Sequence, residues 1–266
     1  MTHAASTILR KIESTPESFA VALRSAVGGE WSDGILDAMG PLTGRNRIAA
    51  SFYDGPGWIA FRPWEKLFLT LQGGQRRARR QILRHLKPGR TLEVGIGDGE
   101  NIALLGDHDL YGVDIARRQL ERCMARHSMM SHKLVWGEAE LLPFANAQFD
   151  SCLSVGGFNH YRDQAEAWRE MRRVTKPGGL IVIADELPTL FKAGIGHVIG
   201  HPRVDAWWLR KLGLDADFVE MVLESSLDLR SLIDIVSPSA QWFSIWLGLG
   251  YCLVDTAPLP SSWTGV

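Results

Sequence analysis

The segment from Thr91 to Asn101 constrains the fold of this chain more than any other part of the sequence. It is a short apolar run that contains an acidic residue and is followed by Gly95, Gly97 and Gly99. Glycine lacks a Cβ atom, so the backbone can turn tightly there and a ligand can approach it closely. A glycine-rich turn between a strand and a helix is typical of the nucleotide-binding corner of a doubly wound α/β sheet.

The spacing of these glycines argues against a dinucleotide. The dinucleotide fingerprint G-x-G-x-x-G would require a third glycine at position 100, where the sequence has Glu100. NAD also carries a pyrophosphate, which favours a helix N-terminus without a nearby carboxylate, whereas Glu93 lies two residues before the first glycine. A ligand with positive charge suits Glu93 better. Taken alone, the segment could also be a glycine-rich loop that binds no ligand.

The pattern Glu-x-Gly-x-Gly-x-Gly, formed by Glu93, Gly95, Gly97 and Gly99, resembles motif I of the class I S-adenosylmethionine-dependent methyltransferases. S-adenosylmethionine has no phosphate, and its sulfonium and amino groups are cationic, which agrees with an acidic residue at the strand end. The resemblance implies S-adenosylmethionine as the cofactor. It also implies a binding site that contains these four residues and Asn101.

A second short apolar strand, near residues 110–114, ends in Asp114 and is followed by Ile115. About 20 residues after the first acid of a β-α-β unit, a carboxylate usually hydrogen-bonds the ribose hydroxyls. NAD enzymes and methyltransferases share this contact, so Asp114 indicates a nucleoside without choosing between them. An Asp at a strand end can equally cap a helix. We expect Asp114 and Ile115 to contact the cofactor.

Two later segments follow the order of the same family. Residues 136–144 contain Glu138-Ala139 and end in Leu-Leu-Pro-Phe, and an apolar run with Ser154 comes next. The resemblance places Glu138 and Ala139 beside the adenine, although the family more often has Asp where this chain has Glu138, and it adds Ser154 to the cofactor-binding candidates. Residues 171–185 then read as a helix that stops at Lys-Pro-Gly-Gly and leads directly into a strand.

These landmarks predict an α/β fold with a Rossmann-like, doubly wound, seven-stranded sheet. The sheet should be mostly parallel, and a C-terminal hairpin at 242–256 should carry its only antiparallel strand. Residues 1–90 are expected to form an N-terminal helical extension and lid, and residues 91–266 the cofactor-binding domain, with a helical insertion at about 187–236. The parallel strands are expected near 91–95, 110–114, 133–136, 151–155 and 179–185.

A lid and a substrate chamber are predicted outside the glycine-rich half. Phe52-Tyr53-Asp54 resembles a segment that folds over the cofactor in methyltransferases of the ubiquinone and menaquinone biosynthesis type, although Tyr53 could equally be an aromatic turn anchor. The adjacent Trp207 and Trp208 cannot face the same way on a helix, so one of them is expected to line a pocket. Such a chamber should open beside 156–161 and be walled by 53–64 and 187–236, unless these apolar residues simply bury one another.

Catalysis is less well defined by the sequence. Methyl transfer is an in-line displacement for which the enzyme mainly aligns the reactants, and a base is needed only if the acceptor must lose a proton of high pKa. His160 is the first candidate for a base and Tyr161 the second, because both follow the fourth strand at the carboxyl edge of the sheet. A matching His in many relatives is structural. No Asn-Pro-Pro-Tyr segment follows that strand, which disfavours nucleobase and protein-glutamine acceptors.

The composition restricts the class of protein. The chain has 266 residues with 29 Lys and Arg against 30 Asp and Glu, and this balance argues against a dedicated nucleic-acid binder. Its three cysteines form no close pair, so no metal site is expected and a reducing compartment is indicated. No apolar run is long enough to span a bilayer, and residues 1–18 contain no secretory h-region. We therefore expect a cytoplasmic protein, with peripheral membrane contact left open.

The basic run at 76–80 is expected to be the solvated face of an amphipathic helix that packs on the sheet. The leading functional hypothesis is methyl transfer from S-adenosylmethionine to a small hydrophobic molecule at carbon or oxygen. One alternative is a non-methylating user of the same fold, which normally has an acidic pair where this chain has Gly156-Gly157. Another is a non-catalytic protein that binds the cofactor. The sequence gives no prediction of the oligomeric state.

Overall fold

The computed structural model describes residues 19–24, 29–71, 74–190, 194–225 and 227–258. Within these residues a single sheet of nine strands has the order β1-β2-β5-β4-β3-β6-β7-β9-β8. The central strands from β2 to β7 are parallel, and β9 is antiparallel to both of its neighbours. The strands are β1 (Glu30–Ser32), β2 (Ile35–Asp37), β3 (Arg90–Val94), β4 (Asp109–Asp114), β5 (Leu134–Trp136), β6 (Phe149–Val155), β7 (Thr175–Glu186), β8 (Gln241–Ile245) and β9 (Gly250–Thr256).

The Rossmann-like arrangement of the seven expected strands is confirmed, but the expected strand count is wrong. β1 and β2 extend the sheet from a region for which we expected helix, and β1 is antiparallel to β2, so the C-terminal hairpin does not carry the only antiparallel strand. Asp33 and Gly34 have φ of +53° and +76°, which allows the tight turn between the two strands. Ile35 and Leu36 are then 0% and 1% exposed, because adding β2 to β5 buries both of them.

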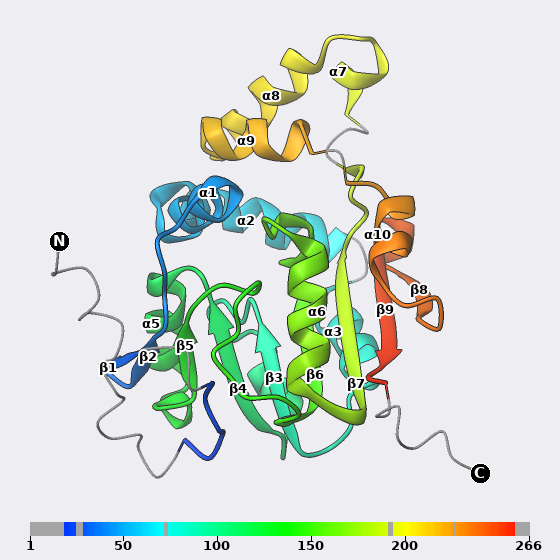
Figure 1. Cartoon of the computed structure of the whole chain (residues 1–266). Helices are drawn as coiled ribbons and strands as arrows, with labels where there is room; N and C mark the ends of the chain where they lie inside the picture. The colour runs from blue at the N-terminus through cyan, green and yellow to red at the C-terminus, as the bar shows by residue number, and fades with distance from the viewer. Residues whose placement is uncertain (1–18, 25–28, 72–73, 191–193, 226, 259–266) are drawn as a thin grey trace, which may run out of the picture.

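Helices cover both faces of the sheet, so each central strand is buried on two sides (Figure 1). One face packs against α6 and α10, and the other against α3 and α5. Successive side chains of β7 point to opposite faces of the sheet. Ile181 and Ile183 pack in the core on the α6 and α10 side, and Val182 packs in the core on the α3 and α5 side. These helices are α3 (Gln75–Leu83), α5 (Arg117–Arg126), α6 (Gln164–Val174) and α10 (Leu229–Ile235), and the short α4 (Ile102–Leu105) follows the glycine-rich loop.

A helical cap lies over the carboxyl ends of the parallel strands, at the top of Figure 1. It consists of α1 (Gly44–Asp54), α2 (Pro56–Leu71), α7 (Ile195–Val198), α8 (Pro202–Lys211) and α9 (Ala216–Leu223). Phe52 of α1 stacks on Phe218 of α9 with ring centroids 4.0 Å apart, which joins the two parts of the cap. Within the helical insertion expected at about 187–236, residues 215–235 contain two separate helices, α9 and α10, and residues 187–198 are helical only at 195–198 where described.

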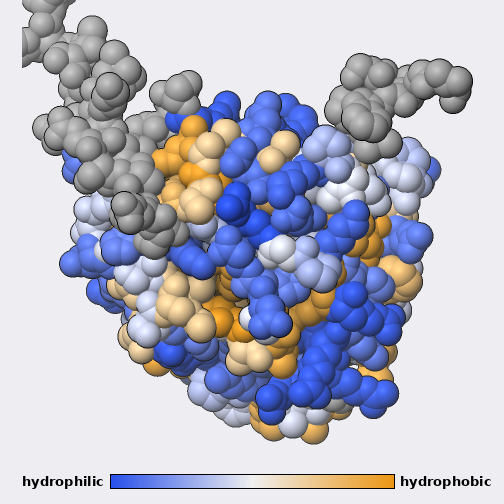
Figure 2. Space-filling model, turned by 90° about the horizontal axis from the view of Figure 1, so that it is seen from below, coloured by the Kyte–Doolittle hydropathy of each residue, from blue (hydrophilic) through white to orange (hydrophobic). Residues whose placement is uncertain are grey.

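The opposite face of the molecule, at the amino ends of the central strands, is seen from below in Figure 2. Hydrophilic residues cover much of it, around smaller hydrophobic areas. Residues 1–18, which bear on the expected absence of a secretory signal, lie outside the described residues. In the described part of the chain, no helix has both the length and the apolar character needed to cross a membrane.

Candidate cofactor and acceptor site

The glycine-rich loop begins where β3 ends and turns back toward α4. Gly95, Gly97 and Gly99 have φ of +77°, +56° and +82°, a left-handed conformation that favours glycine. A Cβ atom on Gly99 would lie 2.6 Å from Ile102 Cδ1, so this glycine serves the packing of the loop. A Cβ atom on Gly97 would have no neighbour within 4 Å. Gly95 and Gly97 line the large cavity beneath the cap, where a ligand can approach the backbone, and Gly99 does not.

Glu93 places a buried carboxylate at the edge of this cavity. Asn101 Nδ2 donates to Glu93 Oε1 at 2.5 Å, while Oε2 is buried without a hydrogen-bond partner in the described part of the chain. Burial raises the pKa of Glu93 to about 7. Asn101 does not reach the cavity and instead supports Glu93, and its side-chain Oδ1 accepts from Arg79 Nη1 at 2.7 Å. The free oxygen atom suits a cationic or donor group of a ligand.

Asp114 lies at the end of the neighbouring strand and also lines the cavity. Its two oxygens accept the backbone N–H groups of Gly97 at 2.7 Å and of Ala116 at 2.8 Å. Burial raises the pKa of Asp114 to about 6. Each carboxylate oxygen retains acceptor capacity for a further donor, such as a hydroxyl. Ile115 follows in the cavity wall, and its carbonyl accepts from Trp136 Nε1 at 2.9 Å.

The loop after β5 contributes backbone and small side chains to the same end of the cavity. Gly137 and Ala139 line it, whereas the Glu138 side chain does not. Glu138 Oε2 lies 3.6 Å from Arg162 Nη2, and Glu138 Oε1 is buried without a partner among the described residues. The loop thus lies at the cavity through Gly137 and Ala139, and the Glu138 side chain lies beside the wall rather than in it.

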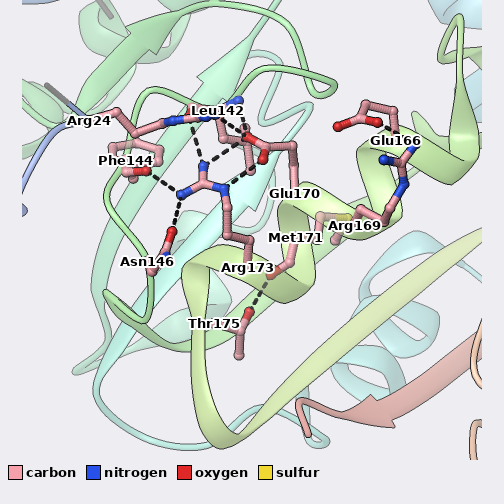
Figure 3. A network of polar contacts seen from close by, with 10 residues as sticks. All are labelled: Arg24, Leu142, Phe144, Asn146, Glu166, Arg169, Glu170, Met171, Arg173 and Thr175. Atoms are coloured by element: carbon pink, nitrogen blue, oxygen red, sulfur yellow. Dashed lines mark hydrogen bonds and ion pairs between the residues drawn. The ribbon is translucent and has the colours of Figure 1, made fainter. Parts of the chain in front are cut away.

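An ion-pair network holds this loop in place (Figure 3). Glu170 of α6 accepts the backbone N–H of Leu142 at 2.8 Å and pairs with Arg173 one turn later at 2.6 Å. Arg173 in turn donates to the carbonyls of Leu142 and Phe144 at 3.0 and 2.7 Å. The backbone of the loop is thus bound to α6 on both its donor and its acceptor groups, which fixes the path of residues 137–144.

The cavity has a volume of about 680 Å³ and joins this polar end to an apolar chamber. The expected chamber walls are confirmed, because the lining comes from 53–64, from 156–161 and from 187–236. Trp208 lines the chamber and Trp207 does not, as the helix geometry requires. The apolar wall includes Phe52, Tyr53, Trp58 and Phe61 of the first two helices, and Trp208, Leu209, Leu212, Leu214 and Phe218 of the later helices.

Tyr53 is held in the wall by its neighbours in the sequence and in space. Its ring lies 5.0 Å from that of Trp58 and 5.9 Å from that of Phe218, and its carbonyl accepts from Gln119 at 2.7 Å. Asp54 accepts the backbone N–H of Arg118 at 2.8 Å, at the start of α5. The Phe-Tyr-Asp segment therefore connects the cap to the cofactor half of the sheet, and Gln119 is a cavity residue that no sequence motif indicated.

His160 lies at the junction between the polar and apolar parts of the cavity. Its Nε2 atom is 3.5 Å from Glu186 Oε1, and its ring lies 5.4 Å from that of Phe218. Burial opposes ionisation of Glu186, but its interactions with His160 and Asp185 outweigh this cost and lower the pKa of Glu186 to about 2. Burial, and then the neighbouring Glu186, raise the pKa of Asp185 well above its usual range. No sequence motif indicated Glu186, which lies at the end of β7.

Tyr161 also reaches the cavity, but its hydroxyl is already engaged. It donates to the carbonyl of Val94 at 3.0 Å and lies 2.9 Å from Ser154 Oγ. Burial raises the pKa of Tyr161 well above its usual range. Ser154 is 0% exposed and does not line the cavity. These contacts join the ends of β3 and β6 beneath the glycine-rich loop, and they make the Tyr161 hydroxyl unsuited to accept a proton.

A group of charged residues from α2 and α3 contacts the outer side of the loop. Arg62 pairs with Asp98 and with Glu100, the latter at 2.9 Å, and Arg79 pairs with Glu100 at 2.7 Å. Arg79 is therefore not part of the solvated basic face expected for its helix. Burial raises the pKa of Glu65, which also lines the cavity, to about 7. None of these contacts was indicated by a motif.

A protein-family comparison identifies residues 92–183 as a methyltransferase domain. This match covers both the glycine-rich loop and Asp114. These residues are therefore a class I S-adenosylmethionine-dependent methyltransferase domain. The cofactor expected from the sequence is thus confirmed at the level of the family.

Among curated proteins, the chain is 34% identical to the malonyl-[acyl-carrier protein] O-methyltransferase of Erwinia pyrifoliae, over 41% of this chain and 43% of that protein. It is 29% identical to the demethylmenaquinone methyltransferase of Thermotoga maritima, over 44% of this chain and 52% of that protein. The chain thus spans about half the length of these relatives. Among solved structures, phosphoethanolamine N-methyltransferase 2 of Haemonchus contortus aligns with a TM-score of 0.48 and 14% identity, over 83% of this chain and 61% of that one.

The raised pKa values give a pH dependence to the stability of the ligand-free protein. The pKa values of Glu93, about 7, and Asp114, about 6, lie above their ordinary values of 4.5 and 3.8, so the folded state binds more protons than the unfolded state between these limits. We expect the melting temperature to fall as the pH rises through this window, and Glu93→Gln to reduce the slope. Differential scanning calorimetry at several pH values across this window measures the slope of the melting temperature against pH.

Glu121→Gln is the matched control, because this glutamate lies half-exposed on α5. It should leave the slope unchanged. A melting temperature that rises with pH between about 4.5 and about 7 in the wild type, or an identical slope in Glu93→Gln, would contradict the buried position of Glu93.

Proposed function

We propose that the protein transfers a methyl group from S-adenosylmethionine to a small, hydrophobic molecule at oxygen or carbon. The observation that carries this proposal is the continuity of the cavity. The buried carboxylates Glu93 and Asp114 line one end, aromatic side chains of the cap line the other, and His160 lies between them. A site that binds both reactants and excludes water is what an in-line displacement requires.

The cofactor end has donors and acceptors that fit S-adenosylmethionine. Glu93 Oε2, which lacks a partner among the described residues, suits the amino group. Asp114 keeps acceptor capacity for the ribose hydroxyls, and the open space at Gly97 allows close approach of the ligand. For the adenine we assign Ile115 and Ala139, which both line the cavity, to the ring faces. Tyr53 would close this end from the cap side.

When bound, the cofactor supplies an electrophilic methyl group, and the electrons of the broken S–C bond return to sulfur. The protein has two tasks in this reaction. It must orient the acceptor, for which the rings of Trp58, Phe61 and Phe218 form a rigid apolar wall. It must also accept the proton that a hydroxyl or an acidic carbon loses. His160 is the residue at the junction that can do this, and ionised Glu186 would stabilise its protonated form.

The hydrophobic acceptor is supported by the chamber and by the names of the relatives. Ligand pockets of several hundred Å³ are mostly apolar with few fixed polar groups, as this chamber is. The acceptors in the relatives' names include demethylmenaquinone and, for a Mycobacterium ulcerans protein 32% identical over 38% of this chain and 38% of that protein, phthiotriol and phenolphthiotriol dimycocerosates. We propose an acceptor of comparable hydrophobic character, without assigning one compound.

The first test concerns the cofactor. We expect S-adenosylhomocysteine to bind, and Asp114→Ala to weaken binding by roughly 1.5–3 kcal/mol through loss of a charge-assisted hydrogen bond. Isothermal titration calorimetry measures both affinities. Asp107→Ala, an exposed aspartate of the loop before β4, is the control and should bind as the wild type does. Tighter binding of NAD than of S-adenosylhomocysteine would contradict the proposal.

The second test concerns the acceptor. The protein is incubated with radiolabelled S-adenosylmethionine and a cell extract divided into lipid-soluble and polar fractions, and the labelled product is identified. We expect label in the lipid-soluble fraction. For the identified compound, Trp208→Ala should raise KM by roughly tenfold through loss of apolar contact, whereas Trp207→Ala, outside the cavity, should not. Label only in small polar amines would contradict the hydrophobic acceptor, and cofactor binding with no labelled product would favour the non-catalytic alternative.

The third test concerns the base. With a hydroxyl acceptor, His160→Gln should lower kcat by about 10²- to 10⁴-fold and leave the affinity for S-adenosylhomocysteine unchanged. Glu186→Gln should lower kcat less, because it removes the carboxylate beside the imidazole while leaving the imidazole itself in place. His201→Gln, an exposed histidine at the start of α8, is the control. An unchanged kcat in His160→Gln would exclude this histidine as the base.

A further inference from the structure

Helix α2 is unusual because it is largely apolar and yet lies mostly at the surface. Gly57 is the only buried residue among its 16. Trp64, Leu67, Phe68 and Leu71 recur at i, i+3, i+4 and i+7, so they form one stripe along the helix. Their exposed fractions are 50%, 51%, 49% and 73%. A contiguous exposed apolar surface of this kind usually marks a protein or membrane contact.

This α2 stripe also forms part of the rim of the cavity. All four of its residues line the cavity while remaining 49–73% exposed, and Trp208 of α8, which is 57% exposed, lines it too. A molecule that enters the chamber from this side passes between apolar side chains of α2 and α8. Apolar side chains of both helices therefore flank the route from the exterior to the aromatic wall.

The next helix along the chain, α3, is in contact with α2 (Figure 1). Arg76, Arg77, Arg80 and Arg84 are exposed and share one face of α3, a helix whose sequence contains no acidic residue. Within the described residues these four side chains form no ion pair with a carboxylate; the nearby Glu100 instead pairs with Arg62 and Arg79. The charge of this α3 face is thus available to an external anion.

We propose that the α2 stripe and the α3 face together form a docking surface for an anionic lipid membrane, with the cavity mouth facing the bilayer. An apolar helix face with Trp, Phe and Leu beside clustered arginines is the composition of interfacial membrane-binding helices, and each arginine near an anionic surface adds to the affinity. With 16 residues α2 is short for a membrane-spanning helix, so it would lie in the plane of the membrane–water interface. A symmetric dimer on this surface is disfavoured, because it would bring eight like-charged arginines from two copies close together. The benefit to catalysis rests on the proposed hydrophobic acceptor, but vesicle binding does not.

Vesicle sedimentation tests the docking surface directly. The whole protein is mixed with vesicles of phosphatidylcholine alone or with added phosphatidylglycerol, and the bound fraction is measured at low and high salt. We expect binding to the anionic vesicles only, weakened by salt. Arg76→Gln/Arg80→Gln should weaken binding roughly thirtyfold, and Leu67→Ser/Leu71→Ser by tenfold or more. The melting temperature, measured on every variant by differential scanning calorimetry, verifies that each is folded.

Matched controls lie elsewhere on the surface. Arg169→Gln/Arg172→Gln removes two charges from α6, and Met129→Ser/Leu229→Ser replaces two exposed apolar residues remote from α2. Both should bind vesicles as the wild type does. Absence of wild-type binding, or equal loss in the controls, would overturn the proposal. So would a dimer in sedimentation velocity that the Leu67→Ser/Leu71→Ser variant dissociates, since a second copy would then cover the stripe. If the protein does not bind vesicles but still methylates a solubilised acceptor, the docking surface is excluded and the proposed function is not.

Discussion

Two carboxylates, Glu93 and Asp114, are buried side by side at the carboxyl ends of adjacent parallel strands, and the surrounding structure compensates for their burial. Removing a carboxylate from water is costly unless hydrogen bonds replace the lost solvent. Asn101 and the backbone N–H groups of Gly97 and Ala116 provide part of that replacement. The raised pKa values of both acids reflect the remainder. A ligand that brings a cation and hydroxyl groups to this point would supply the hydrogen bonds that the two carboxylates still lack. The glycine-rich loop therefore has two roles, because its backbone hydrogen-bonds Asp114 and its glycines leave space for the ligand.

The cap extends the same dry environment to the acceptor. The stacked rings of Phe52 and Phe218 join α1 to α9 over the sheet, and the Phe-Tyr-Asp segment binds the cap to the start of α5. In such surroundings the contact between His160 and Glu186 is stronger than it would be in water. The apolar stripe of α2 then connects this interior to the exterior. The cavity thus has buried charged residues at its cofactor end, aromatic residues in the proposed acceptor chamber and exposed apolar residues at its rim.

The parts of the fold and site that could be predicted are those encoded by neighbouring residues. Glycine spacing, strand-end acids and the Lys-Pro-Gly-Gly stop are local, and they correctly located the parallel strands from β3 to β7 along the chain. The short strands β1 and β2 escaped prediction because three residues are too few for a periodic signal, although Asp33-Gly34 is a turn signature. Glu186, Glu65 and Gln119 escaped because each belongs to an ordinary strand or helix, and only the packing of that element directs the side chain into the cavity.

The sequence by itself determined the nucleotide-binding corner and the class of its ligand, because a tight left-handed turn requires glycine and a strand-end acid needs no distant partner to be placed. The tertiary structure alone decided which polar groups surround that corner. It showed that the Tyr161 hydroxyl bonds the Val94 carbonyl, that Arg79 turns inward to Glu100, and that His160 contacts Glu186. These pairs join residues far apart in the chain, and their contacts depend on how whole helices and strands pack, which no local pattern encodes.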